Sequence, residues 1–133
     1  MNYLLDTHIF LWTVFSSKKV PKNIRKILTD TQLLKYVSLL TFWEISLKFS
    51  LGKIKLQGIS PEDMPEIAVK AGYEILNLEP QTVSTYHKLP KGKNKDPFDR
   101  MLAWQAICKD YKLITQDSDF KTYKDHGLKI VEK

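Results

Sequence analysis

Short apolar segments that alternate with helix-forming segments restrict the fold of this chain more than any other feature. Strands separated by helices pair in parallel and need a helical layer on each face of the sheet. The sequence therefore predicts an α/β fold, a three-layer α/β/α sandwich around a mostly parallel central sheet. At 133 residues we expect one domain, spanning 1–133. The predicted strands are Asn2–Asp6, Leu33–Ser38, Tyr73–Leu78, Leu113–Thr115 and Leu128–Val131.

Helix signals fill the intervals between these strands. Proline at a first helical position, short polar caps and glycine stops mark the ends. The segment that begins Asp96-Pro97-Phe98-Asp99 is apolar nearly all round, which indicates a buried helix. The predicted helices are Thr7–Phe15, Pro21–Leu28, one capped by Thr41 that runs to Ser50, one with a capping box at Ser60–Asp63 that stops at Gly72, Gln81–Leu89, and one through Ile107.

Composition excludes several classes of protein and points toward a polyanionic partner. The uncharged apolar runs are much shorter than the ~20 residues of a membrane span, so we expect no membrane contact. A lone Cys108 fits a reducing cytoplasm, and with three scattered histidines it argues against structural zinc. The net charge is +6, and the runs Lys18–Lys26 and Lys88–Lys95 contain no acid. Lysines often only solvate loops, but two such runs favour attraction to nucleic acid.

Four acids fall where sites form in a parallel sheet, at the carboxyl ends of strands and the helix starts beyond them. They are Asp6, Glu44, Asp99 and Asp117. Gathered carboxylates repel one another unless a cation offsets them, and an oxygen-only site suits Mg²⁺ or Mn²⁺. Such an ion activates water and stabilises charge on a phosphoryl group. The four acids therefore predict a metal site that acts on a nucleic-acid backbone.

Each acid also has an ordinary structural explanation. A helix cap, an i,i+4 pair or a turn accounts for most of them singly. Asp6 is the exception, because a carboxylate that ends an apolar strand is costly to bury without a partner. The ordinary roles are a cap for Asp6, a cap shared by Asp96 and Asp99, a pair of Glu44 with Lys48, and a turn for Asp117 like that for Asp119.

Four motifs follow one another along the chain: Tyr3–Trp12, Ser38–Lys48 with Gly52-Lys53-Ile54, Asp96–Arg100 with Gln105-Ala106, and Leu113–Phe120. Together they resemble the PIN-domain ribonucleases, particularly the VapC-type toxins of bacterial toxin–antitoxin pairs. They occur in the family's order and span nearly the whole chain. The chain departs from the usual pattern at Asn94-Lys95, where relatives often have His-Arg, and at Trp104, where alanine is common.

The resemblance implies an endoribonuclease that depends on Mg²⁺ or Mn²⁺, forms a homodimer and is neutralised by a cognate antitoxin protein. By motif, the acidic site would be Asp6, Glu44, Asp99 and Asp117, all catalytic and metal-binding. Thr7 and Thr115 would orient Asp6 and Asp117, and Asp96 would assist or cap. Lys91, Lys93 and Lys95 would hold the RNA backbone, and Arg100 would add a contact or pair with a neighbouring acid.

Other classes of protein fit the sequence less well. A receiver-type signalling domain would need paired acids after the first strand, whereas Thr7 and His8 follow Asp6. A P-loop needs G-x-x-x-x-G-K-[ST], and Gly52-Lys53 has Ile54 after it. Two alternatives stay open. One is a catalytically inactive RNA- or protein-binding module on the same fold, and the other is a DNA or flap nuclease.

Overall fold

Five short parallel strands form the central sheet of the computed structural model, which describes residues 1–131. The strand order is β3-β2-β1-β4-β5, so the chain moves from β1 to one side of the sheet and later returns to the other. All four strand pairs are parallel, which confirms the predicted α/β sandwich. The strands are β1 Tyr3–Leu5, β2 Lys35–Ser38, β3 Glu74–Leu76, β4 Lys112–Ile114 and β5 Lys129–Ile130.

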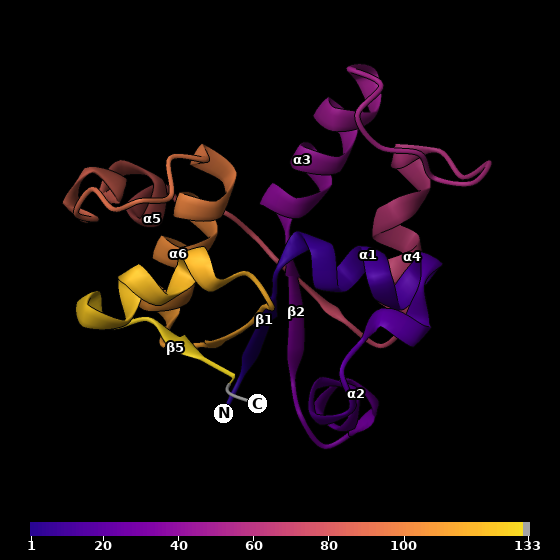
Figure 1. The fold of residues 1–133 in the computed structure, drawn as a ribbon, viewed down its shortest axis with the longest axis horizontal. Helices are drawn as coiled ribbons and strands as arrows, with labels where there is room; N and C mark the ends of the chain where they lie inside the picture. The colour runs from indigo at the N-terminus through magenta and orange to yellow at the C-terminus, as the bar shows by residue number, and fades with distance from the viewer. Residues whose placement is uncertain (132–133) are drawn as a thin grey trace.

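Helices connect successive strands and cover the sheet (Figure 1). The α-helices are α1 Thr7–Phe15, α2 Lys22–Thr29, α3 Leu39–Ser50, α4 Met64–Lys70, α5 Pro80–Ser84 and α6 Pro97–Lys109. Four 3-10 helices complete the chain: η1 Ser17–Lys19, η2 Pro61–Asp63, η3 Tyr86–Lys88 and η4 Ser118–His126. None of the helices within residues 1–131 is both long and apolar enough to cross a membrane.

Two buried apolar clusters lie on the two faces of the sheet. Successive strand residues point to opposite faces, so Leu4 belongs to one cluster and Leu5 to the other. On the first face, α6 and η4 supply Leu102, Ala103, Ala106, Phe120 and Tyr123. On the second face, α1, α2 and α4 supply Ile9, Phe10, Ile24, Met64 and Ala68. The strands are therefore apolar on both sides, as expected for a buried parallel sheet.

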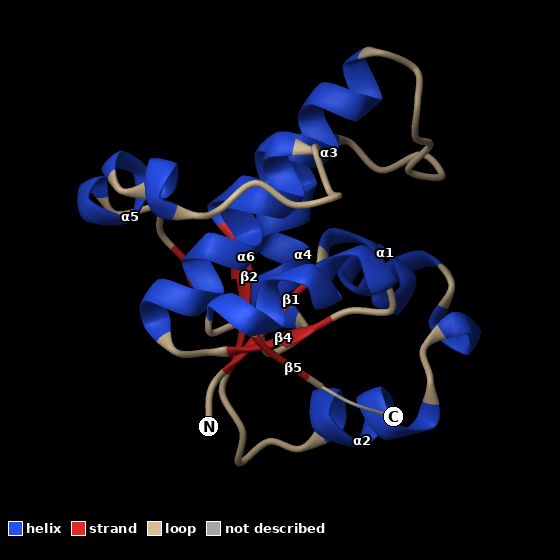
Figure 2. Ribbon diagram, turned by 60° about the vertical axis from the view of Figure 1, so that its left-hand side comes forward, coloured by secondary structure: helices blue, strands red, loops and turns tan. Residues whose placement is uncertain are grey.

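The position of α3 differs from that of the other helices. It begins at the carboxyl end of β2 and projects away from the sheet in both views (Figures 1 and 2). Its N-cap is Ser38, whose Oγ accepts the backbone N–H of Leu40 at 3.0 Å. The predicted cap, Thr41, is wrong, because the strand already ends at a serine with the same capping chemistry three residues earlier. Thr41 is instead buried inside the helix.

Other boundaries differ modestly from the prediction. The capping box at Ser60 and Asp63 is present, but it opens η2 before α4 begins. The predicted helix Gln81–Leu89 is split into α5 and η3, with Thr85 between them. Hydroxyl competition explains the break, because Thr85 Oγ1 donates to the carbonyl of Gln81 at 2.7 Å.

Candidate metal centre

Acidic side chains converge at the carboxyl edge of the sheet, where β1, β2 and β4 end and α1, α3 and α6 begin. Asp6 follows β1 directly, and Asp99 lies in the first turn of α6. Glu44 lies in the second turn of α3. Asp6 and Glu44 are almost fully buried, at 2% and 3% exposure. Burying two carboxylates is costly without compensation, so their partners define what the site can do.

Asp6 is only partly satisfied by the protein. Its Oδ2 accepts a hydrogen bond from Thr115 Oγ1 at 2.8 Å. Its Oδ1 is the one buried side-chain polar atom among residues 1–131 that lacks a hydrogen-bond partner. Burial raises the pKa of Asp6 to about 6; the Thr115 hydrogen bond and the charge of His8 oppose this rise, and the charge of Glu44 adds to it. The carboxylate therefore lacks a cation or donor at Oδ1.

Asp99 lies beside a second acid, Asp96, at the start of α6. Asp96 is the N-cap, and its Oδ1 accepts the backbone N–H groups of Phe98 and Asp99 at 2.8 and 3.2 Å. The side chain of Asn94 donates to Asp99 Oδ2 at 3.2 Å. Burial raises the pKa of Asp99 to about 7, and the charges of Asp6, Asp96 and Glu44 add to the rise. Burial first, and then repulsion from the neighbouring carboxylates, therefore disfavour the ionised forms of Asp6 and Asp99.

Glu44 is held from both sides. Thr7 Oγ1 donates to its Oε1 at 2.7 Å, and the hydroxyls of Thr7 and Thr41 lie 3.2 Å apart. The ammonium group of Lys48, one turn along α3, pairs with Oε2. Burial alone would lower the pKa of Lys48, but the hydrogen bond to Glu44 and the charges of Asp96 and Asp99 together raise it. One lysine therefore faces several carboxylates.

A divalent cation fits this arrangement. Among the described residues, Glu44, Asp96 and Asp99 offer carboxylate oxygens that all lie within 4.8 Å of one another. The unpartnered Oδ1 of Asp6 belongs to a carboxylate whose charge acts on Asp99. An oxygen-only donor set of this kind suits Mg²⁺ or Mn²⁺. Asp96 therefore has two roles: it caps α6, and its carboxylate lies close enough to those of Glu44 and Asp99 to share a cation with them.

Asp117 lies on the other side of Asp6. The two residues line one small cavity of about 200 Å³ together with Trp12. Asp117 caps η4, since its Oδ1 accepts the backbone N–H of Asp119 at 2.9 Å. Thr115 links the two acids, because the same hydroxyl that donates to Asp6 accepts the backbone N–H of Asp117 at 3.0 Å. The fold therefore brings Asp117 near Asp6, and both residues lie outside the group of Glu44, Asp96 and Asp99 whose oxygens converge within 4.8 Å.

Thr115 and Asp96 take the orienting and capping roles expected of them, whereas Thr7 and Arg100 do not. The hydroxyl of Thr7 bonds to Glu44 rather than to Asp6. Arg100 makes no ion pair with a neighbouring acid within the described chain, and its guanidinium instead bonds to neutral oxygens of Tyr86, Leu89, Pro90 and Tyr123. The lysines Lys91, Lys93 and Lys95 are exposed on the loop before α6.

Asn94 and Thr41 are site residues that the motif comparison missed. Asn94 is buried, and besides holding Asp99 it accepts the backbone N–H of Asp96 at 3.0 Å. An asparagine two residues before a helix cap is a usual local turn residue, so the sequence carried a signal for this turn. Nothing local marks Thr41, whose contact with Thr7 joins α1 to α3.

The chain is similar to known proteins over nearly its full length. Residues 3–125 match the PIN domain family. The structure of VapBC2 from Rickettsia felis, bound to a DNA fragment from its promoter, matches with a TM-score of 0.69 and 19% identity over 98% of both chains. VapBC-1 from nontypeable Haemophilus influenzae matches with a TM-score of 0.66 and 21% identity, over 99% of this chain and 98% of that one.

A third solved structure, VapBC-5 of the VapBC toxin–antitoxin family from Mycobacterium tuberculosis, gives a TM-score of 0.61 at 16% identity, over 99% of this chain and 98% of that one. A comparison with curated protein sequences finds no significant match. At these identities the solved structures establish the shared fold, and the family match rests on the sequence from the start of β1 to residue 125, within η4. This protein belongs to the PIN-domain family.

Proposed function

We propose that this protein is an endoribonuclease that depends on Mg²⁺ or Mn²⁺ and hydrolyses RNA phosphodiester bonds, acting in the cytoplasm as the toxin of a toxin–antitoxin pair. One observation carries the proposal. On a PIN fold, the buried Oδ1 of Asp6 has no partner and lies at the edge where Glu44, Asp96 and Asp99 converge. A buried charge without a partner is rarely retained unless something binds it.

The chain's own residues would hold the ion and keep the site in shape. Asp6 and Asp99 would be the principal ligands, with Glu44 and Asp117 as further ligands. Thr7 and Lys48 keep the Glu44 carboxylate in place. Such an ion, when bound, supplies a Lewis acid that activates water and offsets charge on the phosphoryl group. The group formed by Glu44, Asp96 and Asp99 contains no histidine, whereas His8, exposed on α1, lines the small cavity that Asp6 and Asp117 share.

The partners that we propose are a second copy of the chain and a cognate antitoxin protein. The structures from Rickettsia, Haemophilus and Mycobacterium are all VapBC proteins. On this chain, α3 exposes an apolar stripe at i,i+4 spacing that Leu39, Trp43, Leu47 and Leu51 form, with Trp43 61% exposed. Apolar stripes of this kind mark protein contacts. An antitoxin arginine that entered the acidic cluster would pair with the carboxylates and exclude a metal ion.

The test is cleavage of a panel of structured RNAs by the purified protein in Mg²⁺, in EDTA and as Asp6→Asn. A matched control is Asp119→Asn, which removes an exposed aspartate outside the cluster. We expect cleavage by the wild type and the control in Mg²⁺, and none in EDTA or with Asp6→Asn. EDTA-resistant cleavage indicates contaminating ribonuclease, so each preparation needs that control.

Two other outcomes would replace the proposal. An Asp6→Asn variant with full Mg²⁺-dependent activity would refute the site. The absence of cleavage and of metal binding under every condition would identify a binding module that has lost activity. Cleavage of duplex or flap DNA in preference to RNA would identify a DNA nuclease on the same fold.

A further inference from the structure

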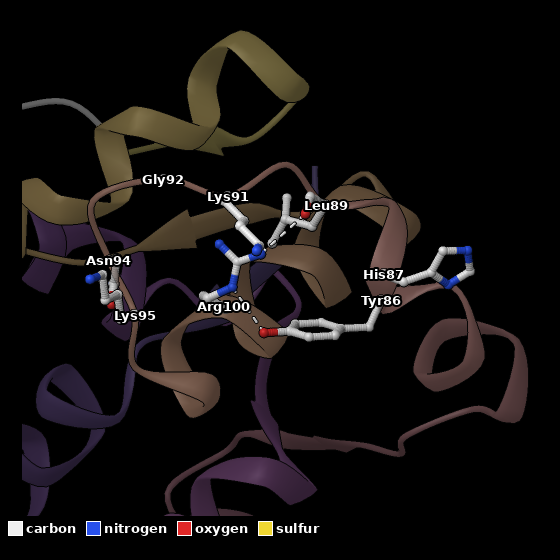
Figure 3. A pocket seen from close by; sticks show the side chains of 8 residues that line it. All are labelled: Tyr86, His87, Leu89, Lys91, Gly92, Asn94, Lys95 and Arg100. Carbon is white, nitrogen blue, oxygen red and sulfur yellow. Dashed lines mark hydrogen bonds between the residues drawn. The ribbon is translucent and has the colours of Figure 1, made fainter.

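A basic cavity lies between the segment from η3 to Lys95 and the start of α6 (Figure 3). Its volume is about 550 Å³. Ligand sites commonly span about 300–1,000 Å³, so the cavity has room for a group the size of a nucleotide. Lys91, Lys95 and Arg100 line it, and none of the lining residues is acidic. The surface thus gathers positive charge without neutralising it.

Arg100 forms a fixed wall of this cavity. Its Nε donates to Tyr86 Oη at 2.9 Å, and its Nη1 donates to Tyr123 Oη at 3.1 Å. Nη1 also donates to the carbonyl of Pro90 at 3.3 Å, and Nη2 donates to the carbonyl of Leu89 at 3.1 Å. The guanidinium also lies over the rings of both tyrosines, 5.5 and 5.8 Å from their centres. All of these partners are neutral, so the full positive charge of Arg100 remains.

The loop that carries the two lysines is anchored rather than free. At Gly92, an added Cβ would lie 3.1 Å from Oγ1 and Cγ2 of Thr122, so the loop packs closely on η4. Tyr123 Oη also donates to the backbone carbonyl of Asn94 at 3.2 Å. These contacts fix the backbone of the loop at Gly92 and Asn94, the neighbours of Lys91 and Lys95. A pre-formed cluster of cations loses less conformational freedom on binding an anion than mobile side chains would.

Asn94 connects the cavity to the acids. It lines the cavity, and its side-chain amide donates to Asp99 Oδ2. A strand of nucleic acid that reached the acidic cluster would therefore have its neighbouring phosphates next to Lys91 and Lys95. Lysine and arginine side chains are the usual phosphate contacts in such complexes. The buried Asn94 therefore lies between the basic cavity and the acidic cluster.

We propose that this cavity binds a backbone phosphate, with its ribose, of single-stranded RNA in the nucleotide next to the bond that is cut. The proposal rests on the proposed nuclease function for its choice of RNA and names where that substrate lies. Lys91 and Lys95 contact this phosphate and the one next to it, one lysine to each, and Arg100 holds the loop and supplies the fixed charge. Asn94 fixes the spacing between the phosphate and the acidic cluster.

The test measures binding of a fluorescein-labelled single-stranded RNA to the full chain in EDTA, by anisotropy, across a range of NaCl concentrations. The first variant is Lys91→Ala with Lys95→Ala. The matched control is Lys22→Ala with Lys26→Ala, which removes the same charge from exposed positions on α2, at the opposite edge of the sheet (Figure 1). Each lost contact with a single-stranded phosphate reduces the slope of log K against log [salt] by about 0.7.

We expect the variant that lacks Lys91 and Lys95 to reduce the slope by about 1.4. The ratio of wild-type to variant affinity should then be roughly tenfold larger at about 0.15 M salt than at about 1 M salt. The control pair should leave the slope within about 0.3 of the wild type. In ¹⁵N–¹H spectra, the same RNA should shift the backbone amide of Gly92 and the side-chain amide of Asn94, and should leave Gly58 unchanged.

Equal slope changes in the two pairs would show that only overall charge matters and would overturn the proposal. A slope change that occurs with DNA of the same sequence and not with RNA would also overturn it. Because EDTA prevents metal-dependent chemistry, the result is independent of cleavage. If the wild type cleaves RNA in Mg²⁺ but the loss of Lys91 and Lys95 leaves the slope unaltered, RNA binding in the cavity is refuted and the nuclease proposal stands. If the slope falls but the wild type cleaves no RNA, the nuclease proposal is refuted and RNA binding in the cavity stands.

Discussion

Replacing Asp6 by asparagine should change how the stability of the metal-free protein depends on pH. Asp6 is 2% exposed, and burial raises its pKa from 3.8 to about 6. The folded state therefore keeps a proton that the unfolded state has already lost between these two values. That stabilisation is complete below pH 3.8 and is lost as pH rises through about 6. An asparagine at this position has no proton to lose.

The size of the effect follows from the shift. Each pKa unit corresponds to about 1.36 kcal/mol, so ionising Asp6 costs the folded state about 3 kcal/mol. The asparagine can still accept from Thr115, but its amide group places a buried donor where Oδ1 lay, which costs about 1 kcal/mol at any pH. The free energy of unfolding of Asp6→Asn, measured relative to that of the wild type, should therefore rise by about 3 kcal/mol between about pH 4 and pH 8.

Urea unfolding followed by tryptophan fluorescence in EDTA measures this difference at each pH. Linear extrapolation gives the free energy of unfolding in water. At about pH 8, the metal-free variant should be more stable than the wild type by about 2 kcal/mol, and at about pH 4 it should be equal or slightly less stable. A difference that stays constant across this range would mean that Asp6 is not an uncompensated buried carboxylate, and the metal assignment would lose its main support.

Two further substitutions test the supporting residues. Lys48→Met removes the cation that pairs with Glu44; it should destabilise the metal-free protein by about 1–2 kcal/mol and strengthen Mn²⁺ binding several-fold by calorimetry. Lys53→Met, at an exposed position just beyond α3, should change neither quantity. Thr115→Val removes the hydroxyl between Asp6 and Asp117 and should cost about 1–3 kcal/mol in urea unfolding; an unchanged midpoint would refute this bridge.

The sequence was sufficient to predict the sheet, because the signals for a buried parallel strand are local. Leu4 and Leu5 face opposite sides of the sheet, and both are fully buried. An uninterrupted apolar pair in a short segment is typical of a strand covered on both faces. The same locality explains why Asp6 was predicted as a site residue, since a carboxylate that ends such a strand must be buried with it.

The partners of the acids could not be predicted, because they depend on how helices pack. Thr7 is next to Asp6 in the chain, but α1 directs its hydroxyl toward α3, where it meets Glu44. The bonds of Arg100 reach Tyr86 and Tyr123, 14 and 23 residues away. Spacing along the sequence says nothing about such contacts, so an ion pair with a nearby acid was the wrong expectation.

Capping shows the same limit within one segment. Ser38 and Thr41 both have hydroxyls that can cap a helix, and the choice between them depends on where β2 ends. Register with β1 and β3 fixes that end, because Ser38 still pairs with Leu76. Sequence patterns alone therefore locate helix ends less well than they locate helices.

Calorimetric titration of the metal-free protein with Mn²⁺ tests the central claim, that the acids at the carboxyl edge of the sheet form a divalent-cation site. The wild type and Asp119→Asn should bind Mn²⁺ with the same affinity, and bound Mn²⁺ should raise the free energy of unfolding as its concentration increases. Asp6→Asn should lose that binding while remaining folded. Equal Mn²⁺ affinity in Asp6→Asn and the wild type, or no binding to the wild type, would contradict the account.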